Sequence, residues 1–95
     1  MNNFKMVLLD QLSCANCYAL QHELKPICEE KGIEFQLITD SNIDSDFIKQ
    51  YEVVSYPTGL LFNGDKFLGK FKGYQPKEIL EIWLDTKLNE RGNKR

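Results

Sequence analysis

The stretch Ser13-Cys14-Ala15-Asn16-Cys17 places two thiols three positions apart, where a run of apolar residues gives way to a helical pattern. If Cys14 opens that helix, its sulfur faces the unpaired backbone N–H groups and the positive dipole end of the first turn. Both effects stabilise a thiolate relative to a thiol. One helical turn also brings the sulfurs of Cys14 and Cys17 within bonding reach. The stretch is therefore a candidate redox site.

The composition predicts one soluble domain. The 95 residues allow a single core, which we expect over about residues 4–88, with a polar tail over residues 89–95. Twelve basic and 14 acidic side chains give a net charge of −2, which favours neither nucleic acid nor a membrane surface as the main partner. No apolar run is long enough for a membrane span or a signal peptide, so we expect a cytoplasmic protein.

The chain has three cysteines, and this odd number excludes a fully paired structural disulfide framework in a monomer. In a reducing compartment, two close cysteines are more often catalytic or metal-binding than structural. A zinc site would need two further ligands, and the candidates His22 and Cys28 lie on the same helix as the pair, which is a poor geometry for a closed tetrahedron. Cys28 falls on the apolar stripe of that helix, where a buried inert thiol is expected.

The apolar pattern predicts an α/β fold in the order strand, helix, strand, helix, strand, strand, helix. The expected strands are 5–9, 33–39, about 59–62 and 66–72, and the expected helices are 14 to about 31, 44 or 45 to about 51, and 76 to about 88. Two strands joined by a helix should be parallel, and the last two should form a hairpin, giving a mixed four-stranded sheet with helices on both faces. The apolar residues expected to be buried in the two later helices are Phe47, Ile48, Tyr51, Ile79, Leu80, Trp83, Leu84 and Leu88.

Five local signals punctuate these elements. Ser13 is a suitable N-cap for the first helix, Pro26 predicts a kink inside that helix, and Gly32 predicts its end. Asn63-Gly64 predicts a two-residue hairpin turn because both residues tolerate positive φ. Pro76 fits the first position of the last helix.

This order of elements, with Cys-x-x-Cys at the start of the first helix, resembles the thioredoxin-like fold in the short form that glutaredoxins have. The stretch Tyr51-Glu52-Val53-Val54-Ser55-Tyr56-Pro57-Thr58, the hairpin Leu61-Phe62-Asn63-Gly64 and Gly73 before the last helix are similar to thioredoxin itself. The resemblance covers residues 5–88. It implies a β-α-β-α-β-β-α order, with a four-stranded mixed sheet flanked by three helices.

The resemblance also implies a substrate-binding region. Pro57 is expected to be a cis proline that packs beside the dithiol. The backbone of Ser55 and Tyr56 would pair with an extended substrate strand, and the Gly73-Tyr74 loop would line the other side. The side chains of the two tyrosines are interpreted equally well as substrate contacts or as packing.

The implied activity is thiol–disulfide exchange. Cys14, the more exposed thiol, would attack a protein disulfide, and Cys17 would resolve the mixed disulfide. The Cys14–Cys17 disulfide would be the only redox group, with no further cofactor and no metal. Thioredoxin reductase or glutathione would be the electron donor, and the protein is expected to be a monomer.

The sequence departs from the thioredoxin pattern around the dithiol. Ser13 stands in place of a tryptophan, Ala15-Asn16 in place of Gly-Pro, and Leu8 at the position of a buried carboxylate. Asp10 is the nearest acid and is a candidate for assisting proton transfer. Three alternatives therefore stay open: a glutathione-coupled glutaredoxin-type enzyme, a redox sensor or adaptor, and a metal-binding module that holds zinc or a subunit-bridging iron–sulfur cluster.

Overall fold

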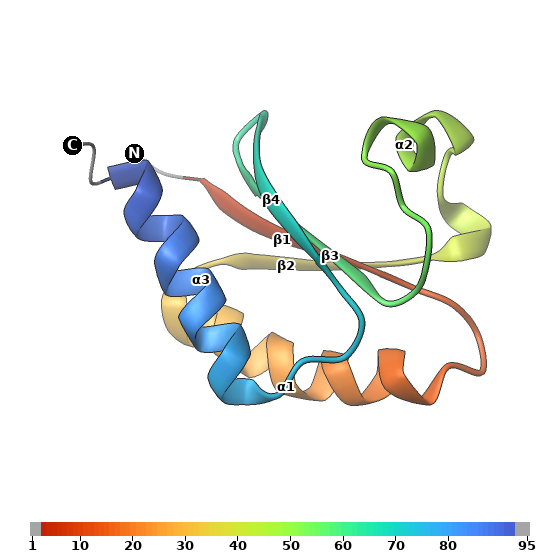
Figure 1. Cartoon of the computed structure of the whole chain (residues 1–95), viewed down its shortest axis with the longest axis horizontal. Helices are drawn as coiled ribbons and strands as arrows, with labels where there is room; N and C mark the ends of the chain where they lie inside the picture. The colour runs from red at the N-terminus through yellow and green to blue at the C-terminus, as the bar shows by residue number, and fades with distance from the viewer. Residues whose placement is uncertain (1–2, 93–95) are drawn as a thin grey trace.

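Four strands and three α-helices make up the computed structural model, which describes residues 3–92 (Figure 1). In chain order they are β1 (Phe4–Asp10), α1 (Ala15–Lys31), β2 (Glu34–Thr39), the 3₁₀ turn η1 (Asp40–Asn42), α2 (Ser45–Gln50), β3 (Thr58–Asn63), β4 (Lys66–Lys72) and α3 (Lys77–Gly92). The order predicted from the sequence is confirmed, and η1 is an addition to it. α1 runs as one helix with Pro26 inside it and ends at Gly32, whose φ is 72°.

The strands form one mixed sheet in the order β2-β1-β3-β4. β1 pairs in parallel with β2, because α1 carries the chain back across the sheet, and antiparallel with β3, which forms a hairpin with β4. In the register of β1 and β3, Leu9 lies opposite Thr58, and Phe4 lies opposite Asn63. The end of β1 and the start of β3 therefore meet at one end of the sheet, and the β3–β4 turn lies at the other.

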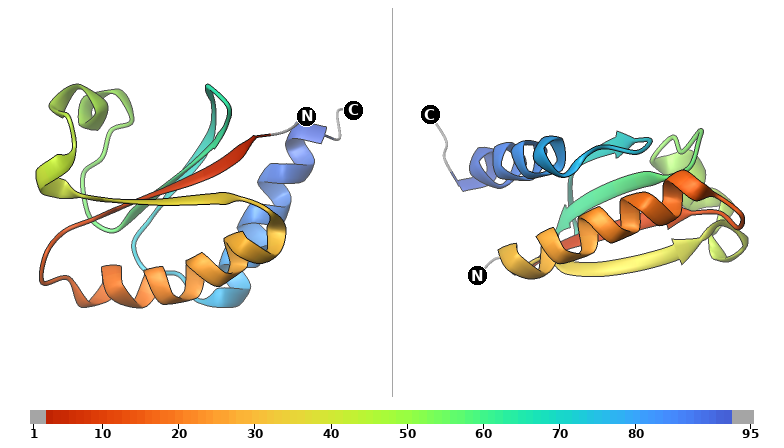
Figure 2. Two further views of the ribbon diagram at one scale, coloured as in Figure 1. Left: turned by 180° about the vertical axis from the view of Figure 1, so that it is seen from behind. Right: turned by 90° about the horizontal axis from the view of Figure 1, so that it is seen from below.

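Alternate residues of β1 belong to two separate apolar clusters. Met6 and Leu8 pack with residues of α1 and α3, whereas Val7 and Leu9 pack on the α2 side. This alternation follows from the two-residue period of a strand. Helices α1 and α3 thus cover one face of the sheet and α2 covers the other (Figure 2).

The sheet is least covered on the α2 side. Phe47, Ile48 and Tyr51 are only partly buried there, so the prediction that they are buried is wrong in degree. The reason is the length of α2, which has six residues and leaves an open groove lined by Phe47 and Tyr51 together with Phe62 of β3.

The β3–β4 turn differs from its prediction by one residue. Asn63 still pairs with Lys66, so the two turn residues are Gly64 and Asp65 instead of Asn63 and Gly64. Gly64 takes a positive φ of 60°. Asn63 stays in the strand because it pairs with Phe4 of β1 and Lys66 of β4, and its Oδ1 also accepts a hydrogen bond from the Asn3 N–H at 3.0 Å.

Helix α3 also departs from the prediction at both ends. Pro76 precedes the helix and accepts a hydrogen bond from the Leu80 N–H at 3.0 Å, so it caps the helix instead of occupying its first position. The helix continues through Gly92 into the predicted tail, whose residues 93–95 lie outside the described part of the chain. Leu80 and Leu84 are buried as predicted, Trp83 and Leu88 are partly buried, and Ile79 is 47 % exposed.

A close contact between β3 and β4 requires a glycine at position 59. A Cβ atom on Gly59 of β3 would lie 2.5 Å from the ring of Phe71 on β4, so only glycine fits there. The Phe71 ring in turn packs edge-to-face against Trp83 of α3, with ring centroids 5.1 Å apart.

Within residues 3–92, no helix is long and apolar enough to cross a membrane.

Candidate active site

Cys14 and Cys17 form a disulfide at the start of α1, with their Cα atoms 5.2 Å apart. Cys14 is the N-cap, with an extended backbone (φ −113°, ψ 103°), and its Sγ accepts a hydrogen bond from the Cys17 N–H at 3.1 Å. The prediction that Ser13 caps the helix is therefore wrong. Ser13 lies one residue too early, at a φ of 57°. The sulfur of Cys14 thus takes the place that a serine or aspartate oxygen usually has at an N-cap.

The two sulfurs have different access to solvent. Cys14 is partly exposed, whereas Cys17 is 1 % exposed because it faces the sheet on the apolar stripe of α1. When the disulfide is reduced, the first turn's N–H groups and dipole stabilise a Cys14 thiolate, and a partner's sulfur can reach it. Cys17 is placed to react only with its neighbour.

The loop before β3 lies at the same end of the sheet as the dithiol. The Tyr56–Pro57 peptide bond is cis, and Pro57 is buried. Thr58 Oγ1 donates to the Ser55 carbonyl at 2.7 Å, and the Gly73 N–H donates to the Pro57 carbonyl at 2.8 Å. These bonds bring the predicted substrate-binding segments, at residues 55–57 and 73–74, together as one surface.

The two tyrosines of this surface have different environments. Tyr56 packs against the apolar cluster on the α2 side, and burial together with the negative charge of Asp40 raises the pKa of its phenol. Tyr74 is 38 % exposed. The side chain of Tyr56 is thus a packing group, while that of Tyr74 is open to a partner.

Asp10 ends β1 and is partly buried. Its Oδ1 is shielded from solvent and accepts no hydrogen bond from the described residues. Asp10 and Cys14 line the same open groove. Leu8, at the position where the thioredoxin pattern has a carboxylate, is fully buried and apolar. Asp10 is therefore the acid that the chain offers next to the dithiol.

Cys28 is the free cysteine, and it is 0 % exposed. Burial, and secondarily the charge of Glu29, raises the pKa of the Cys28 thiol to about 12. The predicted burial of this thiol is confirmed. His22, the other zinc ligand considered, is exposed and packs edge-to-face on Tyr18 at 4.5 Å. Within residues 3–92, no group of three or more His, Cys, Asp and Glu side chains is arranged to hold a metal ion.

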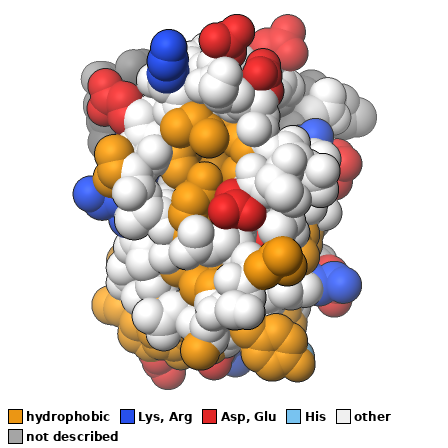
Figure 3. All heavy atoms as spheres, turned by 90° about the vertical axis from the view of Figure 1, so that its right-hand side faces the viewer, with side chains coloured by type: hydrophobic (Ala, Val, Ile, Leu, Met, Phe, Trp, Pro, Cys, Tyr) orange, Lys and Arg blue, Asp and Glu red, His pale blue; other side chains and the backbone are white. Residues whose placement is uncertain are grey.

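The sequence did not single out the exposed apolar side chains around the dithiol. Leu12 is 78 %, Tyr18 65 % and Val54 74 % exposed. Figure 3 shows hydrophobic side chains gathered on this end of the molecule. A signal was available for Tyr18, since it lies four residues after Cys14 and off the apolar stripe of α1, and so must share the outer face of the helix with Cys14.

Known proteins share sequence and fold with this chain to different degrees. No protein-family sequence model matches the chain. The chain is 29 % identical over 87 residues to protein disulfide isomerase-like 1-3 of Arabidopsis thaliana. That match covers 90 % of this chain but only 15 % of the longer plant protein.

Several solved structures share the fold of this chain over most of their own length. Thioredoxin-2 of the malaria parasite, described as a component of its protein secretion machinery, superposes with a TM-score of 0.75 at 15 % identity, over 90 % of this chain and 84 % of that one. A second malarial protein gives 0.75 at 18 % identity, over 92 % and 99 % of the two chains. A chain from a study of thiol resolution in yeast mitochondrial 1-Cys peroxiredoxin, through glutathione and thioredoxin systems, gives 0.72 at 20 % identity, over 90 % and 80 %.

The fold is therefore thioredoxin-like, as the sequence predicts, and its Cys-x-x-Cys pair is joined at the start of α1.

Proposed function

We propose that this protein is a thiol–disulfide oxidoreductase that reduces protein disulfides by dithiol exchange through Cys14 and Cys17. The observation that carries the proposal is the unequal pair: a solvent-accessible sulfur at a helix N-cap, bonded to a buried sulfur one turn later. The thioredoxin-like fold and the similarity to a protein disulfide isomerase-like protein support the same class of chemistry.

The exchange has two sulfur transfers. The Cys14 thiolate attacks one sulfur of the substrate disulfide, forming a mixed disulfide and releasing the first substrate sulfur as a thiolate, which takes a proton from water. Cys17 then loses its proton and attacks Cys14 Sγ, which closes the Cys14–Cys17 bond and releases the second substrate thiolate. Two electrons pass to the substrate, and an external reductant must return the pair to its reduced form. That reductant is either thioredoxin reductase or two molecules of glutathione, which leave as glutathione disulfide.

Asp10 is our candidate acceptor for the Cys17 proton. Its carboxylate lies beside the dithiol, and its shielded Oδ1 has no hydrogen-bond partner among residues 3–92, so a proton would find an acceptor there. Substrate would bind mainly through the backbone of Ser55 and Tyr56 and of the Gly73-Tyr74 loop. Main-chain recognition of this kind suits a range of protein disulfides. A monomer in a reducing cytoplasm fits the unpaired, buried Cys28.

The test is reduction of insulin disulfides, with thioredoxin reductase and NADPH in one series and glutathione in another. We expect turnover in at least one series. We expect Cys14→Ser to abolish it and Cys17→Ser to accumulate mixed disulfides with substrate. Full activity of Cys14→Ser would contradict the assigned nucleophile.

The electron donor that supports turnover distinguishes the alternative functions. Turnover with glutathione alone would identify a glutaredoxin-type enzyme. Absence of turnover with both donors, for protein reduced just before the assay, would leave a redox sensor or adaptor, or a metal-binding module.

A further inference from the structure

A groove runs beside Cys14 on the side of the β1–α1 loop, and the exchange chemistry does not account for its shape. It is formed by the end of β1, the loop and the first turn of α1. Its lining residues are Asp10, Gln11, Leu12, Ser13, Cys14, Ala15 and Tyr18. The substrate-binding backbone of residues 55–57 lies outside it, so the groove would meet a different part of a bound substrate.

Two large apolar side chains of the groove lining are mostly exposed to solvent. Leu12 and Tyr18, two large side chains, are 78 % and 65 % exposed, although the protein has two apolar clusters that bury residues of this kind. They flank the reactive sulfur of Cys14, one on the loop and one on the next turn of the helix. Such side chains are suited to the aliphatic part of a side chain from a partner.

The charge in the groove is a single negative one. Asp10 is the acidic residue of the lining, and no lysine, arginine or histidine belongs to it. One of its oxygens is shielded from water and accepts no hydrogen bond within residues 3–92, so the carboxylate is less well solvated than an ordinary surface acid. A cation entering the groove would be attracted by the charge of this carboxylate.

We propose that the groove is a substrate subsite that selects disulfides with a lysine or arginine next to the cysteine under attack. The methylene stem of such a side chain would lie on Leu12 and the ring of Tyr18, and its charged head would approach Asp10. The ring face of Tyr18 offers a further attraction to a cation. The inference rests on the proposed function, because it names the substrate class for the same site.

Peptide substrates test the subsite directly. The set consists of disulfide-linked peptides that differ only in one residue flanking the cysteine: lysine, norleucine or glutamate, placed before or after it. We expect kcat/KM to fall from lysine to norleucine to glutamate at one of these positions, by about tenfold overall, the size expected of an exposed pair of charges turned from attractive to repulsive. Equal rates for lysine and glutamate at both positions would overturn the proposal.

Two variants locate the preference. Asp10→Asn should bring the lysine-to-glutamate ratio to within about twofold of unity, since the carboxylate supplies the discrimination. Asp65→Asn is the matched control: it removes the same charge from the exposed β3–β4 turn, at the opposite end of the sheet, and should leave the ratio unchanged. If Asp10→Asn slows all three peptides by one common factor, Asp10 acts only in proton transfer and the subsite is refuted.

A second readout does not depend on turnover. In reduced Cys17→Ser protein, Cys14 is modified with 2-aminoethyl, methyl or 2-sulfonatoethyl methanethiosulfonate. The Cys14 thiolate itself favours the cationic reagent, so the informative quantity is the fall in the cation-to-anion rate ratio when Asp10→Asn is added. We expect a fall of about threefold or more.

The two readouts distinguish the two proposals. A ratio that does not change with Asp10→Asn would overturn the subsite even if every peptide is reduced. Peptides that are not reduced at all, with the reagent ratio behaving as expected, would refute the proposed function and leave the charge selectivity of the groove in place.

Discussion

The two ends of α1 hold the same side chain in opposite environments. Cys14 caps the helix, is partly exposed and accepts a hydrogen bond from a backbone N–H. Cys28, four turns further along, is fully buried, and burial raises the pKa of its thiol to about 12. The difference shows that the position on the helix, and not the residue type, decides which thiol can react.

Two independent physical effects on the thiol pKa produce this contrast. Its N-terminal N–H groups and dipole favour a negative sulfur within the first turn only, and they have no effect at Cys28. The sheet and α3 exclude water from Cys28, which opposes a negative sulfur there. Each effect can be changed separately.

The largest expected effect is on labelling by iodoacetamide. In reduced native protein at pH 8, Cys14 should react readily. In the Cys14→Ser/Cys17→Ser protein, Cys28 should react at least about a thousandfold more slowly, because it is exposed only by unfolding. Mass spectrometry of timed samples measures both rates, and the same reaction in 6 M guanidinium is the control. Comparable native rates would contradict the burial of Cys28.

The second effect is on stability at alkaline pH. The thiol of Cys28 has a pKa of about 12 when folded and an ordinary value near 9 when unfolded, so above pH 9 the unfolded chain releases a proton that the folded one keeps. The contribution of the Cys28 thiol to the free energy of unfolding is therefore fully present below pH 9. It is lost as the pH rises towards 12, by up to about 1.4 kcal/mol per pH unit.

Urea unfolding of the reduced protein between pH 8 and 10.5 measures this loss. Cys28→Ala should have the shallower pH dependence, since tyrosines and lysines contribute equally to both proteins. Parallel curves for the two proteins would show that Cys28 titrates normally.

The third effect is the stability change on removing the Cys28 sulfur. Cys28→Ala should lower the free energy of unfolding by about 1–2 kcal/mol, since it leaves a small cavity among Leu24, Ile27 and neighbouring core residues. Turnover per folded molecule should not change, in contrast to Cys14→Ser. Denaturant unfolding and the insulin assay on one preparation measure both quantities. A large loss of turnover in Cys28→Ala with intact stability would give this thiol a part in the chemistry.

Much of this contrast could be predicted from the sequence. The three- and four-residue spacing of apolar positions predicts that Cys17 and Cys28 face the core, and Cys-x-x-Cys before a helical pattern predicts the redox pair. The strand pattern and the hairpin signal predict the sheet, because each reflects local backbone preference. The structure confirms the burial of Cys17 and Cys28, the four-stranded sheet and the pairing of Cys14 with Cys17, and it moves the hairpin turn by one residue.

The details that the sequence could not predict depend on tertiary contacts. The helix begins one residue later than the capping preference of Ser13 suggests, because that residue is held at positive φ and the sulfur of Cys14 serves as the cap. Tyr56 packs inward because the α2 side of the sheet has room for its ring. The shielding of Asp10 Oδ1 from solvent likewise has no signal in the sequence around it.

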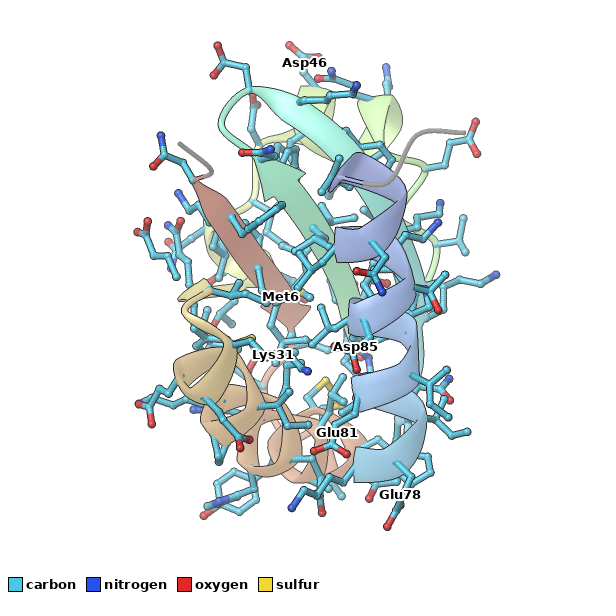
Figure 4. All side chains as sticks on the ribbon, turned by 90° about the vertical axis from the view of Figure 1, so that its left-hand side faces the viewer. Met6, Lys31, Asp46, Glu78, Glu81 and Asp85 are labelled. Carbon is cyan, nitrogen blue, oxygen red and sulfur yellow. A yellow bond between two sulfur atoms is a disulfide. The ribbon has the colours of Figure 1, made fainter. Side chains whose placement is uncertain are left out.

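The smallest effect is expected at the far end of α1, where its last turn is tied to α3. Lys31 Nζ lies 2.6 Å from Asp85 Oδ1, and both labelled side chains can be followed in Figure 4. Asp85 is 60 % exposed, so Asp85→Asn should lower the free energy of unfolding by only about 0.5 kcal/mol, and the loss should vanish in 1 M salt.

Glu81→Gln is the matched control, because Glu81 carries the same charge one turn earlier on α3 and has no ion pair among residues 3–92. Neither substitution should change the rate at which Cys14 is alkylated, since the charges at this end of α1 lie beyond the reach of its first turn. A changed alkylation rate in Asp85→Asn alone would show that the two ends of the helix are coupled, and that the reactivity of Cys14 is not set by its first turn alone.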